Sequence, residues 1–207
     1  MLITRNTQKG LTLIELMIAM TLGIFVTGVI VTVFTTIVRS NVENMKMIRL
    51  NQELRGAMTF MVDEIKRTGY SADPAESAFM TAFYPVNSSC ILYSYDNDGD
   101  GLRDSDEHFG FRLDTSVDQI KWASNATDSC SFGEPITDVN MAEITMLYFD
   151  LTGSINDHGS ADIPPTSGVS VYDVTITLSG TIDLPHGPNP TRTLTETIRV
   201  RNDAPAP

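Results

Sequence analysis

The chain begins with a long apolar stretch. Residues 16–38 contain no charged residue, and at about 1.5 Å per residue a helix of this length can cross a bilayer core of about 30 Å. Arg5 and Lys9 precede the stretch, which favours a cytoplasmic amino end and export of the rest of the chain. A cleaved secretory signal fits less well, because its apolar core is shorter and an Ala-x-Ala pattern follows it. The pattern predicts a transmembrane helix over residues 11–38.

The apolar stretch continues into an amphipathic segment over residues 39–69. Its apolar residues recur at spacings of three or four, which places them on one face of a helix. These residues are Met47, Leu50, Leu54, Met58, Met61 and Ile65. Gly69 follows the last of them, where helices commonly end. We therefore predict one helix over residues 11–68, whose second part packs against a globular head.

Beyond Tyr70 the spacing changes to the alternation that is typical of strands. The predicted strands are 90–95, 109–113, 143–150, 169–184 and 193–201. A long helix followed by antiparallel strands predicts an α+β fold. We expect a β-rich head over residues 70–202 and a tail without structure over residues 203–207.

Charge is unevenly divided along the chain. The 207 residues have a net charge of −12, and residues 68–207 alone hold 21 acidic and 6 basic residues. This balance argues against nucleic acid as a partner, because phosphate binding needs clustered lysine and arginine. An apolar stem followed by an acidic body indicates a protein that is exported but stays tethered to the membrane.

Glu15 is an unusual residue at the start of the apolar stretch. A carboxylate that enters a bilayer costs about 2–3 kcal/mol or more unless it has a partner. Glu15 is therefore either a charge at the membrane surface or a functional group.

The residues around Glu15 read KGLTLIE over residues 9–15. They resemble the leader of type IV pilins and pseudopilins. In that family a membrane peptidase cuts after the glycine and N-methylates the new first residue, and a glutamate is the fifth residue after the cut. The resemblance implies cleavage between Gly10 and Leu11, a leader over residues 1–10, and Glu15 as the fifth residue. The one departure is Leu11, where the family usually has phenylalanine.

The resemblance also implies a role for Glu15 in assembly. In the family, helices of many subunits pack side by side as the core of a filament, so residues 11–38 would form that core. The Glu15 carboxylate would pair with the new amino terminus of a neighbouring subunit. Such a pair cancels two charges in a medium of low dielectric and sets the axial register between subunits.

The end of the helix, residues 51–58 (NQELRGAM) and 63–70 (DEIKRTGY), looks like that of PilW-type minor pilins. This resemblance implies a structural protein, not an enzyme, that takes part in initiation or assembly of a type IV pilus near its tip. It implies partners among other minor pilins, the major pilin, the inner-membrane assembly machinery and prepilin peptidase. It also implies residence in the bacterial inner membrane before assembly, and in the pilus at the cell surface afterwards.

Two cysteines, Cys90 and Cys130, lie in the exported part. An even number of cysteines in an oxidising compartment predicts a disulfide, with two free thiols as the alternative. The chain has no Cys-x-x-Cys motif, so neither redox catalysis nor structural zinc is indicated.

Residues 96–107 read DNDGDGLRDSDE and fit the 12-residue calcium loop at each ligand position. The predicted ligands are Asp96, Asp98, Asp100, Leu102 through its carbonyl, Asp104 and Glu107. Because the flanking residues read as strands, we expect a calcium-binding β-hairpin and not an EF-hand. PilW-like sequences often carry a related loop. The alternative is a polar turn that binds nothing.

Three other functions remain open. One is a minor pseudopilin of a type II secretion system. Another is a membrane-tethered, calcium-dependent enzyme or binding protein, and the third is an anchor that does not assemble and can dispense with Glu15. The three histidines lack metal or triad spacing, and the chain has no nucleophile elbow, phosphate loop or dinucleotide fingerprint.

Overall fold

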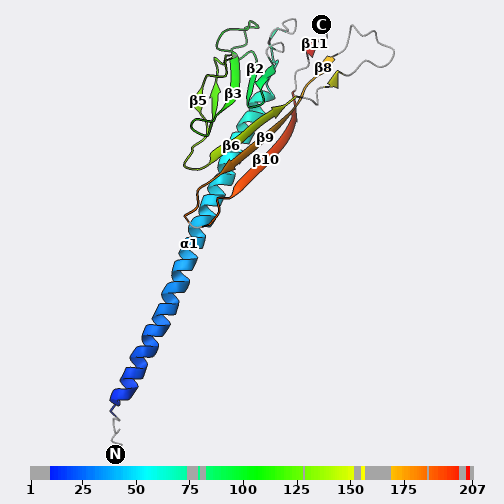
Figure 1. The fold of residues 1–207 in the computed structure, drawn as a ribbon. Helices are drawn as coiled ribbons and strands as arrows, with labels where there is room; N and C mark the ends of the chain where they lie inside the picture. Colours follow the sequence, from blue (N-terminus) through cyan, green and yellow to red (C-terminus); the bar gives the residue numbers. More distant parts are fainter. Residues whose placement is uncertain are drawn as a thin grey trace, which may run out of the picture. The chain divides into compact units, whose positions relative to one another are not determined.

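The computed structural model describes residues 10–73, 79, 83–127, 129–151, 155–156, 169–185, 187–200 and 204–205. The chain forms two compact units, residues 1–45 and 46–207. Helix α1 (Leu13–Ile65) contributes to both units (Figure 1).

The boundaries of α1 lie slightly inside those expected from the sequence. The amide of Glu15 donates to the Thr12 hydroxyl over 3.3 Å, so Thr12 caps the first turn from outside the helix. At the other end, the Arg67 and Thr68 amides donate to carbonyls three residues earlier, which tightens the last turn and ends the regular helix. Gly69 then takes a φ of 77°, a value that suits glycine at a helix end.

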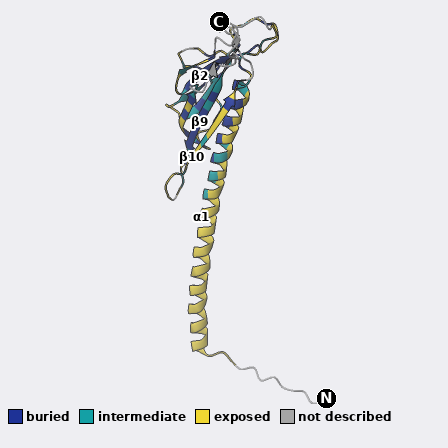
Figure 2. Ribbon diagram, turned by 90° about the vertical axis from the view of Figure 1, so that its right-hand side faces the viewer, coloured by how far each residue is buried: buried dark blue, intermediate teal, exposed yellow. Residues whose placement is uncertain are grey.

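In the first unit α1 has no buried face. Residues 10–42 are all exposed, as the uniform yellow of this part of α1 in Figure 2 shows. By length and composition this part of α1 is apolar enough to cross a membrane. Its apolar side chains therefore need a covering that the described part of the chain does not supply.

The second unit contains three antiparallel sheets. The first has five strands that pair in chain order: β1 (Tyr84–Asn87), β2 (Cys90–Ser94), β3 (His108–Asp114), β4 (Gln119–Ala123) and β5 (Glu134–Pro135). The second has the order β10 (Thr191–Arg199), β9 (Asp173–Thr181) and β6 (Glu143–Asp150). The third consists of the short strands β11 (Ala204–Pro205), β8 (Val169–Val171) and β7 (Ile155–Asn156).

The apolar stripe of α1 forms the centre of the core in the second unit. Leu50, Leu54 and Ile65 are fully buried and belong to one cluster with side chains from the first and second sheets. A Cβ added to Gly180 in β9 would lie 3.0 Å from the Leu54 side chain, so strand and helix are in close contact there. The predicted stripe and the α+β layout are confirmed, and this layout is consistent with the type IV pilin fold that the resemblance implies.

A polar cluster joins α1 to the first sheet. Glu64 accepts hydrogen bonds from the hydroxyls of Tyr95 (3.0 Å) and Tyr93 (3.4 Å), and the Trp122 indole donates to Tyr93 (2.8 Å). Burial, followed by the Glu64 charge, raises the pKa of both tyrosines. Because every group has a partner, the cluster orients the sheet on the helix without leaving a buried charge unpaired.

Several strands differ from those expected. The predicted strand 169–184 is divided into β8 and β9, with Tyr172 between them, and the strand expected over 193–201 lies at Thr191–Arg199. Strands β1, β4 and β5 were not predicted. Ala204 and Pro205 lie within the tail that was expected to lack structure, but they pair with Ser170 and Val169 of β8. This pairing gives the tail backbone partners that its own sequence does not reveal.

Candidate functional site: the processing segment and the acidic loop

Gly10 and Leu11 lie outside α1. Both are exposed, Leu11 by 79%. The predicted cut would thus fall in a non-helical part of the chain. The basic residues Arg5 and Lys9 lie outside the described residues.

Glu15 forms a reciprocal cap with Thr12. Its carboxylate accepts hydrogen bonds from the Thr12 amide (3.0 Å) and hydroxyl (2.8 Å), while its own amide donates to the same hydroxyl. This is the capping-box arrangement. Among the described residues no cation pairs with the carboxylate, so its charge is solvated by Thr12 and not neutralised.

The acidic loop, residues 96–107, connects β2 to β3, which pair as an antiparallel hairpin. Asp96 and Glu107 are each only 3% exposed. The other predicted side-chain ligands, Asp98, Asp100 and Asp104, are exposed. The strand–loop–strand context expected from the sequence is confirmed.

Backbone amides hold the two buried carboxylates of the loop. Asp96 accepts hydrogen bonds from the amides of Ala72 (2.9 Å), Gly99 (2.6 Å) and Gly101 (3.0 Å). These donors, with Ala72 first, lower the pKa of Asp96. Glu107 accepts from the amides of Asn97 (2.6 Å) and Asp104 (3.1 Å). The loop thus places two ionisable carboxylates in its interior and surrounds them with donors.

The structure brings five predicted ligands together in two overlapping groups. One carboxylate oxygen from each of Asp96, Asp98 and Glu107 lies within 4.8 Å of the others, and the same holds for Asp98, Asp100 and Asp104. Oxygens that bind one Ca²⁺ at about 2.3–2.6 Å lie no more than about 5 Å apart. The donor set therefore fits a hard divalent cation. Leu102 can contribute only its carbonyl oxygen, since its hydrocarbon side chain has no ligand atom; that side chain is 63% exposed.

The segment that follows α1 also contacts the loop, which sequence reasoning missed. Besides the Ala72 bond, the Asp96 amide donates to the Tyr70 carbonyl over 2.9 Å. A Cβ at Gly101 would lie 2.9 Å from that of Asp73, so this glycine permits close contact with the segment. Asp96 and Ala72 are 24 positions apart, and no local pattern links them.

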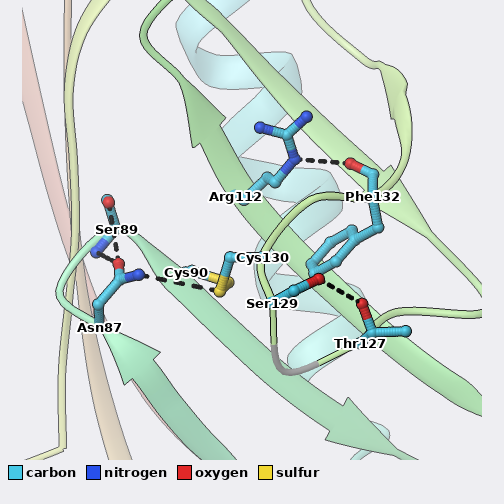
Figure 3. Close-up of a disulfide and its surroundings, with 8 residues drawn as sticks. All are labelled: Asn87, Ser89, Cys90, Arg112, Thr127, Ser129, Cys130 and Phe132. Atoms are coloured by element: carbon cyan, nitrogen blue, oxygen red, sulfur yellow. Dashed lines mark hydrogen bonds between the residues drawn. A yellow bond between two sulfur atoms is a disulfide. The ribbon is translucent and has the colours of Figure 1, made fainter.

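The predicted disulfide between Cys90 and Cys130 is confirmed. Their Cα atoms are 6.2 Å apart and the bond spans 40 positions. Asn87 lies beside Cys130 with its amide nitrogen 3.8 Å from the sulfur, and Arg112 donates to the Phe132 carbonyl over 2.6 Å (Figure 3). The bond and these contacts fasten the loop around Cys130 to β1, β2 and β3.

Two family models match this chain. The prokaryotic N-terminal methylation motif matches residues 5–31, which include Gly10, Leu11 and Glu15. The model described as prepilin peptidase-dependent protein B matches residues 43–200, well over half of the chain. The chain belongs to this family. Prepilin peptidase-dependent proteins interact with the peptidase, and the two matches together identify a type IV pilin-like protein. No curated protein and no solved structure matches the chain.

Proposed function

We propose that this member of the family is a PilW-type minor pilin, which is cut between Gly10 and Leu11 and takes part in initiation or assembly of a type IV pilus near its tip. It resides as a single-pass protein in the bacterial inner membrane with its amino end in the cytoplasm, and then in the pilus at the cell surface. Its partners are other minor pilins, the major pilin and the inner-membrane assembly machinery.

One observation carries the proposal: an apolar helix exposed on every side begins with an acid. Residues 10–42 bury no side chain within the chain. Lipid covers such a surface before assembly, and helices of other subunits cover it afterwards. Glu15 lies at the start of this surface, and among the described residues only Thr12 donates hydrogen bonds to its carboxylate. In a filament core its charge would be costly without a cation, and the amine that cleavage creates on a neighbouring Leu11 would be that cation.

Glu15→Gln tests the proposal, with Glu43→Gln as the matched control in the same helix. Both variants are expressed with the major pilin, and the amount of each in sheared surface filaments is measured beside its amount in the membrane. Glu15→Gln should remain in the membrane and be depleted from filaments, or should reduce the number of filaments, whereas Glu43→Gln should behave as wild type. Equal amounts of all three chains in filaments would contradict the proposal.

A minor pseudopilin of a type II secretion system is the second candidate, because the methylation motif and a calcium-type loop suit that class as well. Cross-linking in cells separates the two candidates. The first predicts products with pilus subunits, and the second predicts products with secretion-system subunits.

We also propose that the acidic loop binds calcium. The side-chain ligands are Asp96, Asp98, Asp100, Asp104 and Glu107, with the Leu102 carbonyl as a sixth ligand. The support is the ligand spacing together with the two oxygen groups described above. A bound cation would offset the repulsion among six acids that Arg103 alone counters in these 12 residues.

The isosteric double variant Asp98→Asn with Asp100→Asn tests this, because both side chains are exposed and each accepts one backbone amide that an asparagine oxygen can still accept. Its melting temperature should fall below that of wild type in calcium but stay close to it in a chelator. Glu134→Gln, an exposed acid outside the loop, should change neither value. An equal loss in both conditions would overturn the calcium proposal and leave the pilin proposal intact.

A further inference from the structure

The face of α1 opposite its buried stripe has no covering in the second unit. We call it the Gly56 face; its residues are Ile48, Arg49, Gln52, Arg55, Gly56 and Thr59. All six are exposed, Ile48 by 56%. The face contains an exposed apolar side chain, small or neutral residues and two cations, and exposed Asp63 lies one turn beyond Thr59 on the same side.

No contact within the described part of the chain requires a glycine at position 56. A Cβ added there would meet no atom within 4 Å, so alanine would fit. Glycine inside a helix is less stable than alanine, because it loses more backbone freedom on folding. The fold itself does not need a glycine here. Because glycine has no side chain, another chain can approach the helix backbone closely at this point.

Two arginines lie next to Gly56. Arg55 precedes it directly, and Arg49 lies two turns earlier on nearly the same side of the helix. Neither forms a hydrogen bond or an ion pair within the part of the chain that the structure describes. Both charges are therefore available to an acidic partner.

The acidic loop has the complementary surface. Leu102 is 63% exposed, and the exposed carboxylates of Asp100, Asp104 and Asp106 lie near it in the chain. The loop thus presents the apolar side chain of Leu102 among acidic residues. The Gly56 face presents apolar and small residues beside two arginines, so the two surfaces are complementary in polarity and in charge. In its own molecule this loop packs beside Asp73, after the end of α1, while the surroundings of Gly56 are open.

We propose that the Gly56 face binds the acidic loop of a second copy of this chain. Both halves of the contact are on the same chain, so the contact is heterologous and each copy can give one half and receive the other. Electrostatics favour this pairing, because two heads that each carry a net negative charge repel one another except where a basic face is presented. The loop stays acidic whether or not calcium is bound, since six acids outweigh Arg103 and one divalent ion together.

Site-specific cross-linking of the full chain in bacterial membranes tests the contact. One tagged copy carries Gly56→Cys, a second copy with a different tag carries Leu102→Cys, and a short bismaleimide joins thiols that lie close together. A product with both tags is expected. Val117→Cys, an exposed apolar position in the turn after β3, replaces Leu102→Cys as the control and should give little product.

Charge reversal separates a specific contact from chance collision. Arg49→Glu with Arg55→Glu in the Gly56→Cys copy should lower the yield roughly fivefold, and Ser105→Lys with Asp106→Lys in the Leu102→Cys copy, which leaves the proposed calcium ligands intact, should restore it. A non-reducing gel that shows the Cys90–Cys130 bond verifies that each variant is folded. With folded variants, the absence of the two-tag product, a similar yield with Val117→Cys, or a yield indifferent to charge would each overturn the proposal.

Discussion

The two parts of helix α1 have the same backbone structure but differ in how their side chains are buried. In residues 13–42 every side chain is exposed, although most of them are apolar. From Leu50 to Ile65 one stripe is buried and the opposite face remains polar or small. The first part depends on lipid or other subunits for its covering, whereas the second part is the centre of its own core. Stability should therefore respond to substitutions in the second part, and assembly to those in the first.

The largest expected difference is between Leu54→Ala and Leu22→Ala, the same change in the two parts of one helix. Leu54 is 0% exposed and Leu22 is 59% exposed. Leu54→Ala should lower the free energy of unfolding of the second unit by about 2–5 kcal/mol, because it leaves a cavity. Leu22→Ala should leave that free energy unchanged. Urea unfolding of the full chain in detergent, followed by the fluorescence of the single Trp122, measures both.

Equal losses from the two leucine variants would show that the first part of α1 contributes to the folding of the second unit. The comparison between the two parts would then fail.

The disulfide should have the next largest effect. Replacement of Cys90 and Cys130 by serine frees a loop of 40 positions and should destabilise the second unit by about 2–4 kcal/mol. Wild-type protein with a strong reductant should unfold at the same urea concentration as the variant. A midpoint that the variant and the reductant both leave unchanged would contradict a stabilising role.

Two glycines should respond to alanine in opposite directions. Gly56→Ala should raise the free energy of unfolding by about 1 kcal/mol, because the helix gains a better helix former without a clash. Gly180→Ala should lower it, because the new Cβ would lie 3.0 Å from the Leu54 side chain and 3.2 Å from the Glu143 carbonyl. A Gly56→Ala protein less stable than wild type would show that the fold itself needs this glycine.

The smallest effect should appear at acid pH. The Ser116 hydroxyl, followed by Lys121, lowers the pKa of Asp114, and Lys121 and Arg112 contact it at 3.0 and 3.1 Å. A folded-state pKa below the unfolded value of about 3.9 contributes stability at higher pH, and this stability is lost as pH falls below about 4. Asp114→Asn should therefore be less stable than wild type at pH 7, with a smaller further loss on acidification.

Melting temperatures between pH 2 and pH 7 measure this effect, and exposed Glu134→Gln is the control. Parallel curves for wild type and Asp114→Asn would contradict it.

Features with a local signal could be predicted from the sequence. The apolar stretch, the stripe from Leu50 to Ile65, and the acidic loop each follow from residue spacing, and the Cys90–Cys130 bond followed because only two cysteines are present. Strands β4 and β5 were missed because they depend on pairing with β3 and with each other. The bond from Ala72 to Asp96 and the Glu64–Tyr95 contact join distant positions, and only the folded chain brings these groups together.

The mass of the mature amino terminus tests the central claim most directly. The protein is purified from membranes of cells with active prepilin peptidase and of cells with an inactivated peptidase, and the terminal peptide is identified by mass spectrometry. The account predicts that the chain begins at Leu11, with or without a methyl group, only where the peptidase is active. A chain that still carries residues 1–10 in both strains, or that is cut elsewhere, would contradict it.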